Sequence, residues 1–424
     1  MSDAAAPNEN EPHEAAPDEG APASPPPARR GRWRRPLAWT AAVVAVALIA
    51  AAGTAYGYYR SLRGDMVQHD LGSALPEMER PPKIGDDLNI LFIGSDVRTG
   101  DNAEYGGKDF VGERSDSLML AHISPDKGVT MVNFPRDSVV ELPECTPYGK
   151  TEGTPGYYGM INAALFHGGP PCAVKAVESL TDIRVDHFVH LSFVGFRDMV
   201  DAVGGVRMCI PEPMKDERSH LDLDAGRQTL DGRESLAFVR ARYEIGDGGD
   251  IGRIDRQQIF LSELATKATS SDVLTDPAKL TGLLEAVSKH TSTDDDLTLD
   301  TMLSLGSTLG DTDVKDITFY TVPWEQAPFD PNRVVWNEEK ADRLFHAINN
   351  DRPLDDAQLQ TGRPEPSASP SGKGGPSATP SYPAEPPERE TGGKRGQADP
   401  DEIEGRDATS DACVNGLGEG TGDD

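Results

Sequence analysis

The chain of 424 residues has room for one large domain or two ordinary ones, and its formal net charge at pH 7 is −30. This charge argues against nucleic-acid binding, because a protein that binds phosphate backbones normally needs a basic surface to replace their counterions. An acidic chain that handles phosphate groups needs a local cluster of arginines instead.

The first predicted element is a membrane-spanning helix over residues 36–59. The segment carries no charged residue, and at about 1.5 Å per residue a helix of its length crosses a hydrocarbon core of about 30 Å. Because five arginines precede it, the positive-inside rule predicts a single-pass anchor in the cell membrane, with the N-terminus in the cytoplasm and the chain after Arg60 outside. The competing interpretation is a cleaved signal peptide. The apolar stretch is long for one, and an acidic, Pro/Ala-rich arm precedes it.

Composition divides the rest of the chain. Residues 1–35 are predicted to be a disordered cytoplasmic arm, and residues 351–424 a disordered tail rich in Pro, Ser and Gly. Residues 60–84 are expected to form an extracytoplasmic linker, and residues 85–350 the folded domain. Within the tail, only the DACVNGLG patch around Cys413 suggests a point that docks on the domain.

All four cysteines follow the apolar segment, and none has the CxxC spacing typical of zinc or redox sites. Disulfide bonds are therefore expected. Cys145 and Cys172 flank a loop rich in Gly, Pro and Tyr and are the favoured pair, which leaves Cys209 and Cys413 as a weaker second pair. Sequence alone leaves the connectivity open.

Three strands are predicted at the start of the domain. Residues 88–94 (LNILFIG) form an apolar run typical of a strand buried on both faces. Residues 117–123 and 129–134 follow, and the short turn between them predicts an antiparallel hairpin.

The ends of these strands are expected to bring charged residues together. Arg136 lies beyond the hairpin's last strand, beside Asp116 at the beginning of the other. If the first strand is also antiparallel to its neighbour, Asp96 and Arg98 reach the same edge of the sheet. The motifs GSDVR, RSDS and PRDS would thus converge on one site.

Helices and strands alternate farther along the chain, which predicts an α/β fold with helices on both faces of the sheet. Helical spacing is found at residues 161–166, 172–180, 193–203, 276–289, 299–309 and 338–349, and strand-like patterns at 187–191, 206–210 and 317–322.

Two further segments carry arginines. Asp231 and Glu234 predict a capped helix that leads into Arg240 and Arg242, and an extended backbone there would point both arginines to the same side. Arg253, Arg256 and Gln257 follow at i, i+3 and i+4, on one face at the beginning of a helix that runs to about Lys267. A helix N-terminus with two arginines is a natural anion site.

These residue types match a pyrophosphate. Guanidinium groups bind phosphate oxygens bidentately and stay charged at any relevant pH, so the arginines expected to bind it are Arg136, Arg240, Arg242 and Arg253. The carboxylates of Asp96 and Asp116 would repel that ligand unless a cation lies between them, and Mg²⁺ suits a site of one or two carboxylates with phosphate oxygens.

The alternative for any one of these residues is a surface ion pair. Arg98, Arg114 and Arg256 in particular could hold a carboxylate in place. Asp137, Asp250 and Asp255 are interpreted as caps or partners of the arginines rather than catalytic groups. The serines and histidines show no nucleophile arrangement, and no P-loop, dinucleotide fingerprint or HExxH motif occurs.

Taken together, the segments closely resemble the LytR-CpsA-Psr family over roughly residues 85–270. They are GSDVR, RSDS, PRDS, INAALFHGGP, DHFVHLSFVGFRDMVDAVGGV, LDGRESLAFVRARY and GRIDRQQ, in the family's order. The resemblance implies an α-β-α sandwich with a central mixed sheet, whose apolar interior accepts a polyprenyl tail while arginines hold the pyrophosphate head group.

The resemblance also implies an activity. Such proteins are phosphotransferases that move a phosphate-linked glycopolymer, such as a teichoic acid, from a polyprenyl pyrophosphate carrier in the membrane to peptidoglycan. Carried over by motif, the magnesium ligands are Asp96 and Asp116. The residues implied to be catalytic or to contact the head group are Arg136, Arg240, Arg242, Arg253 and Gln257, with Arg98, Arg114 and Arg256 as further candidates.

Two other functions fit the same residues. A pyrophosphatase would use water in place of the sugar hydroxyl, and a regulator or scaffold would bind the lipid without turnover. Direct control of transcription is not expected, because the cytoplasmic arm is short and acidic and has no DNA-reading motif.

Overall fold

The structure is a computed structural model that describes residues 34–95, 113–126, 128–242, 250–310, 312–352, 405–408 and 412–415. The chain divides between Tyr59 and Arg60 into two compact units. Helix α1 (Arg34–Asp65) crosses this division. Its residues Trp39–Gly64 form the one helix in the described ranges that is long and apolar enough to cross a membrane.

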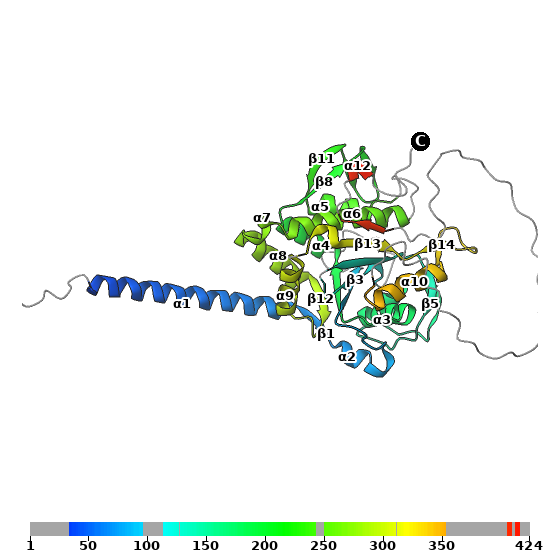
Figure 1. Cartoon of the computed structure of the whole chain (residues 1–424), viewed down its shortest axis with the longest axis horizontal. Helices are drawn as coiled ribbons and strands as arrows, with labels where there is room; N and C mark the ends of the chain where they lie inside the picture. The colour runs from blue at the N-terminus through cyan, green and yellow to red at the C-terminus, as the bar shows by residue number, and fades with distance from the viewer. Residues whose placement is uncertain are drawn as a thin grey trace, which may run out of the picture. The chain divides into compact units, whose positions relative to one another are not determined.

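An eight-stranded mixed sheet is the centre of the second unit (Figure 1). From one edge to the other its strands are β1 (Val67–His69), β12 (Thr291–Asp294), β7 (His187–Ser192), β2 (Leu88–Ser95), β3 (Ser115–Ile123), β4 (Val129–Phe134), β13 (Ile317–Thr321) and β16 (Gly405–Asp407).

The predicted hairpin is confirmed. Strands β3 and β4 are antiparallel, with Leu118 opposite Phe134 and Ile123 opposite Val129. Strand β2 is antiparallel to β3 as well, and an irregularity after Gly94 shifts the register at its end. The end of β2, the start of β3 and the end of β4 therefore lie together, as the sequence predicts. The edge of the sheet that they form is the one made by strand ends, not by an outer strand.

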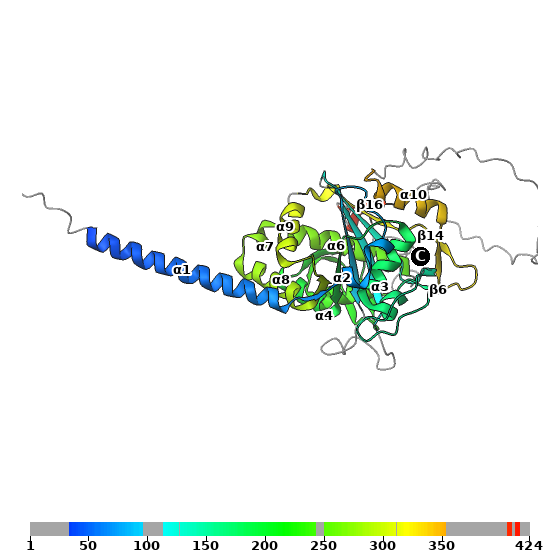
Figure 2. The same cartoon turned by 90° about the horizontal axis from the view of Figure 1, so that it is seen from below.

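Helices cover both faces of the sheet, which confirms the expected α-β-α sandwich. Figure 2 shows α3 (Ala163–Thr181) and α10 (Glu338–Asn349) on one side and α6 (Asp250–Ala268), α8 (Pro277–His290) and α9 (Leu299–Gly310) on the other. The shorter helices are α2 (Leu71–Ala74), α4 (Phe193–Ala202), α5 (Gly232–Arg240), α7 (Ser271–Leu274) and α12 (Ala412–Asn415).

The two faces of β2 are not equally covered. Leu91 and Ile93 point to the side of α3 and α10 and are 0% and 1% exposed within the main apolar core. Phe92 points to the opposite face, because side chains alternate along a strand. It is 36% exposed although β2 lies in the middle of the sheet. On the face toward α6 and α8, the described residues thus leave Phe92 partly uncovered.

Four smaller antiparallel sheets of two strands each lie outside the main sheet. They are β5 (Val139–Leu142) with β6 (Tyr157–Met160), β8 (Val206–Ile210) with β11 (Gly226–Leu230), β9 (Met214–Asp216) with β10 (Leu221–Leu223), and β14 (Trp324–Gln326) with β15 (Val334–Trp336). Strands β8–β11 and helices α5 and α6 enclose a second apolar core that includes Met208, Phe238 and Phe260.

Helix α3 is two helical pieces joined at a kink, as the two separate predicted segments suggest. Gly168 and Gly169 have non-helical backbone angles, and Gly169 has a φ of 63°, which few other residues adopt. The kink lies against the favoured disulfide between Cys145 and Cys172, which is confirmed.

The C-terminal segment returns to the domain. Cys413 forms a disulfide with Cys209 of β8, and β16 pairs antiparallel with β13 at the edge of the sheet. Both lie within residues 351–424, which the sequence predicts to be disordered apart from a docking point at Cys413. That docking point is confirmed, and the expected disorder does not apply to residues 405–408 and 412–415.

Replacing Cys413 with Ser should destabilise the protein by about 2 to 5 kcal/mol, because the bond links residues 204 positions apart and its loss frees a long loop in the unfolded chain. Urea unfolding of the full chain in detergent would measure this. Cys209→Ser should have the same effect, and the double variant should be no worse than either single one. Additive losses would contradict a shared bond as the cause.

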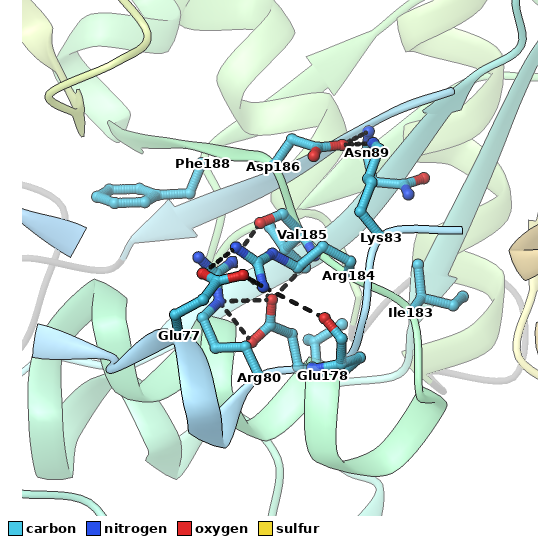
Figure 3. Close-up of polar contacts among 12 residues, drawn as sticks. Glu77, Arg80, Lys83, Asn89, Glu178, Ile183, Arg184, Val185, Asp186 and Phe188 are labelled. Atoms are coloured by element: carbon cyan, nitrogen blue, oxygen red, sulfur yellow. Dashed lines mark hydrogen bonds and ion pairs between the residues drawn. The ribbon is translucent and has the colours of Figure 1, made fainter. Parts of the chain in front are cut away.

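The segment just after α1 also belongs to the fold. Residues 60–84, the predicted linker, contain β1, α2 and a short 3₁₀ helix (Glu77–Glu79). Figure 3 shows how this segment is attached to α3 and β7. Arg80 Nη2 lies 2.6 Å from Glu178 Oε1 of α3, and these side chains are only 8% and 3% exposed. The same carboxylate accepts a hydrogen bond from the backbone N–H of Val185 at 3.0 Å.

Candidate active site

The site begins where β3 starts and β4 ends. Because Leu118 lies opposite Phe134 in the hairpin, Asp116 and Arg136 face each other two residues farther along. Their side chains form an ion pair, with 2.5 Å between Arg136 Nη1 and Asp116 Oδ1. The convergence of RSDS and PRDS is confirmed at this point.

Arg136 is the centre of a charged cluster. Its Nε lies 3.3 Å from Asp250 Oδ1 and 3.8 Å from Asp137 Oδ2. Burial alone lowers the pKa of Arg136, but the carboxylates of Asp116, Asp250 and Asp137 outweigh it, so the pKa is raised. The guanidinium is therefore held charged in a partly dry environment.

The first turn of α6 supplies a second arginine. Arg253 Nη2 lies 2.5 Å from Asp250 Oδ1 and donates to the backbone carbonyl of Asp116 at 3.2 Å. The side chain is almost fully buried, and burial is the main cause that lowers its pKa. Arginine stays protonated nonetheless. Its Nε is buried and has no hydrogen-bond partner among the described residues, which suits a site that receives an anion.

Arg242 joins the cluster from the end of α5. Its side chain lies 3.7 Å from Asp137 Oδ2, and its backbone N–H donates to Asp216 Oδ2 at 2.7 Å. The predicted capping box of Asp231 and Glu234 is confirmed. The extended backbone, however, begins only at Ala241, and Arg240 is the last residue of the helix.

Arg240 therefore lies in the helix, whereas Arg242 lies beyond its C-cap. The guanidinium of Arg240 lies over the ring of Phe193 in α4, 4.6 Å from the ring centre, which is a cation–π contact. The expectation that the two arginines lie side by side on an extended segment is thus wrong, because the helix continues one residue farther than predicted.

Arg256 and Gln257, the other two predicted site residues in α6, support the C-terminal end of α5. Arg256 is 1% exposed and donates to the carbonyl of Ala241 at 2.7 Å, and Gln257 donates to the carbonyl of Val239 at 3.1 Å. Both satisfy carbonyls at the C-terminal end of α5, which would otherwise lack partners. They fix the segment that carries Arg240 and Arg242.

Three other predicted residues have different outcomes. Asp96 and Arg98 lie outside the described residues, so their convergence on this edge stays a prediction. Arg114 lies near His167. Burial is the main cause that lowers the pKa of His167, and the positive charge of Arg114 lowers it further. Among the described residues, no group of three or more His, Cys, Asp or Glu side chains is arranged to hold a metal ion.

The sequence interpretation of Asp137 and Asp250 as partners of the arginines agrees with the structure. It missed Arg333, whose Nη1 lies 3.1 Å from Asp137 Oδ1. Arg333 comes from the loop between β14 and β15, and nothing in its neighbouring residues indicates this role. Only the packing of that loop brings it to the site.

A polar network at the end of β2 was also missed. Glu113 accepts hydrogen bonds from Ser95 and from His190, whose Nε2 lies 2.7 Å away. Burial raises the pKa of Glu113, but these hydrogen bonds and the attraction of His190 outweigh it and hold the pKa below its usual value. Because the carboxylate lies between the serine and the histidine, the trio does not have the order of a serine nucleophile and its base.

Comparison with known proteins gives a family match and several relatives. The sequence model of the LytR_cpsA_psr family matches residues 59–349. The chain is 35% identical over 272 residues to the "Probable cell wall biosynthesis protein LcpB" of Corynebacterium glutamicum, a match that covers 61% of this chain and 60% of that protein.

A second relative carries the name of a transferase. It is the "Polyisoprenyl-teichoic acid--peptidoglycan teichoic acid transferase TagV" of Bacillus subtilis, 32% identical over 231 residues, or 53% of this chain and 52% of that protein. The chain thus spans between half and three fifths of the length of these two curated relatives.

The fold has a solved counterpart. The "LytR-Csp2A-Psr enzyme from Actinomyces oris" superposes with a TM-score of 0.52 at 21% identity, over 67% of this chain and 96% of that one. At this level of identity the likeness concerns the fold alone.

Proposed function

This chain belongs to the LytR_cpsA_psr family, and from that premise we propose that it is a phosphotransferase that moves a glycopolymer from a polyprenyl pyrophosphate carrier to peptidoglycan. The observation that carries the proposal is the cluster in which Arg136, Arg242 and Arg253 contact the carboxylates of Asp116, Asp137 and Asp250. Arginine binds phosphate oxygens with paired N–H donors, so such a cluster suits a pyrophosphate better than a neutral substrate.

An apolar surface for the lipid supports the same proposal. Phe92 in the central strand is 36% exposed, and because side chains alternate along a strand it lies on the face opposite Leu91 and Ile93. Exposing an aromatic side chain in the middle of a sandwich is unfavourable unless a ligand covers it. A polyprenyl chain is apolar and has the chemistry to do so.

A divalent cation is part of the proposal because of the charges in the cluster. Arg136, Arg242 and Arg253 already face three carboxylates, those of Asp116, Asp137 and Asp250. A bound pyrophosphate would therefore add negative charge that the arginines only partly offset. Asp116 fits a magnesium ligand, since its side chain is 29% exposed and only its Oδ1 contacts Arg136. Asp96 would be the second ligand, and bound Mg²⁺ would supply further charge neutralisation.

The reaction needs no covalent enzyme intermediate. A hydroxyl of the acceptor sugar attacks the phosphorus next to the glycopolymer, a new P–O bond forms, and the bond to the lipid phosphate breaks. The lipid phosphate departs, and the proton of the hydroxyl is released to solvent. Arg136 and Arg253 would neutralise charge on the transferred phosphoryl group and the departing phosphate. Arg256 and Gln257 act indirectly, because they hold the backbone that carries Arg240 and Arg242.

The proposed placement follows from α1. Its apolar residues Trp39–Gly64 would anchor the chain in the cell membrane, with the arginine-rich N-terminal flank in the cytoplasm and the sheet outside. This places the site in the compartment that holds peptidoglycan.

The proposal is tested with the full chain in detergent, given a radiolabelled polyprenyl pyrophosphate-linked glycan, peptidoglycan and Mg²⁺. We expect label to become attached to the insoluble peptidoglycan. Free glycan phosphate as the sole product would instead identify a pyrophosphatase. Lipid binding without turnover, unchanged in Asp116→Asn, would identify a scaffold.

Removing divalent cations with EDTA should lower the rate of transfer by roughly a hundredfold or more, because the added pyrophosphate charge would lack a counterion. Addition of Mg²⁺ should restore the rate, and Asp116→Asn should require a higher Mg²⁺ concentration for half-maximal rate. An unchanged rate in EDTA would show that the arginines suffice and that no metal takes part.

A further inference from the structure

An exposed aromatic ring lies flat on the backbone of β6. Tyr157 of β6 is 42% exposed, and its ring carbons occupy the space beside Gly159, where a side chain would come within 2.2 Å of them. Its hydroxyl is hydrogen-bonded to His167 Nε2 at 2.8 Å. One face of the ring is thus covered by the strand, and the ring is fixed in place.

Two residues of α3 extend this surface. The rings of Tyr157 and His167 meet edge to face with 5.3 Å between their centres, and Phe166 meets His167 in the same way at 5.2 Å. Phe166 is 38% exposed. We call Tyr157, Phe166 and His167 the aromatic platform.

The segment between β6 and α3 connects the platform to the candidate active site. The backbone N–H of Ile161, just after β6, donates to the carbonyl of Ser138 at 2.9 Å, and the N–H of Ser115 lies 3.4 Å from the carbonyl of Asn162. Ser138 and Ser115 are the neighbours of Asp137 and Asp116. The charge of Arg114 also acts on His167.

A buried polar atom lies between the platform and the cluster. The side-chain oxygen of Asn162 is buried and has no hydrogen-bond partner among the described residues, and the residue is 6% exposed. A buried acceptor without a partner is costly, so a ligand hydroxyl that donates to it would be favourable.

From these observations we infer that the aromatic platform binds the sugar rings of the acceptor, a peptidoglycan glycan strand, and guides its hydroxyl to the transfer site. The inference deepens the proposed function and rests on it. The C–H bonds on one face of a pyranose ring carry partial positive charge and pack on the negative face of an aromatic ring. An immobilised ring loses little entropy when the sugar binds.

The position of the platform favours the acceptor over the lipid-linked donor. The platform includes residues of α3, on one side of the sheet. Phe92, 36% exposed, lies on the other face, because side chains alternate along β2 and its neighbours Leu91 and Ile93 belong to the core on the α3 side. In phosphoryl transfer the attacking and leaving oxygens are roughly in line with the phosphorus between them. If the lipid lies against Phe92, the attacking sugar must come from the side of α3.

The test measures binding of peptidoglycan glycan strands, freed of their stem peptides, to the full chain in detergent without any lipid donor. Tyr157→Leu should weaken binding about tenfold or more, since it removes the ring but keeps apolar bulk. Tyr157→Phe keeps the ring and should stay within about threefold of the unchanged chain. Tyr158→Leu is the matched control, because Tyr158 is 60% exposed on the same strand but points to its opposite face.

Kinetics separate this inference from the proposed function. In the transfer assay Tyr157→Leu should raise the KM for the acceptor and leave the KM for the lipid donor unchanged. A changed KM for the donor alone, or equal glycan binding by Tyr157→Leu and Tyr158→Leu, would overturn the inference. The inference would also be overturned if the protein bound phosphatidylglycerol vesicles through Tyr157 and did not bind glycan. Glycan binding that depends on Tyr157 in a chain without transferase activity would sustain it while contradicting the proposed function.

Discussion

Replacing Arg136 with Ala should lower the rate of glycopolymer transfer by about a thousandfold or more, the scale expected when an arginine that neutralises a phosphoryl group is lost. Arg136 contacts Asp116, Asp137 and Asp250. Its removal takes away a phosphate ligand and leaves these carboxylates to repel both one another and the substrate. The measurement is kcat/KM for transfer of a labelled glycan to peptidoglycan.

Two further variants separate the chemistry from the folding. Arg136→Lys keeps the positive charge but lacks the paired donors, so it should recover folding stability and only a small part of the activity. Arg233→Ala removes an exposed arginine from α5 and should leave transfer unchanged. A loss smaller than tenfold in well-folded Arg136→Ala would contradict the assignment of the site.

Replacing Glu178 with Gln should lower the free energy of unfolding by about 3 to 5 kcal/mol, because it leaves the buried Arg80 guanidinium without its counter-charge. Arg80 and Glu178 are 8% and 3% exposed, so solvent screens the pair weakly. Arg80 also donates to the carbonyl of Val185 (Figure 3), but a neutral carbonyl does not replace the lost charge. Urea unfolding of the full chain in detergent would measure the change.

The control for this variant is Glu77→Gln. Glu77 lies in the same segment as Arg80 and forms an ion pair with Arg184 at 2.6 Å, but the Glu77 side chain is 78% exposed. Water and salt screen such a pair, so we expect no resolvable change in stability. Equal losses in the two variants would show that burial is not what makes the Arg80–Glu178 pair important.

The elements that local patterns specify were predicted well. The apolar run of residues 88–94 and the short turn after residue 123 gave the antiparallel strands β2, β3 and β4. The opposition of Asp116 and Arg136 follows from that turn, because the register of a hairpin is fixed by its loop and by the alternation of side chains. The disulfide between Cys145 and Cys172 flanks a loop rich in Gly, Pro and Tyr and was favoured for that reason.

Arg240 shows where local reasoning failed. The helix α5 includes Arg240, where an extended backbone was expected, and the guanidinium lies over Phe193. The length of a helix at its end depends on what satisfies its last carbonyls. Here Gln257 and Arg256 provide those hydrogen bonds from another helix.

The sequence by itself determined the opposition of Asp116 and Arg136, because antiparallel pairing and strand alternation are set by neighbouring residues. Only the tertiary structure decided which carboxylate each arginine faces, since Arg333 and Asp137 are 196 positions apart. The same holds for the aromatic platform, where Tyr157 reaches His167 across two elements. Such contacts depend on how loops pack on the sheet, and no periodic pattern in the chain records that packing.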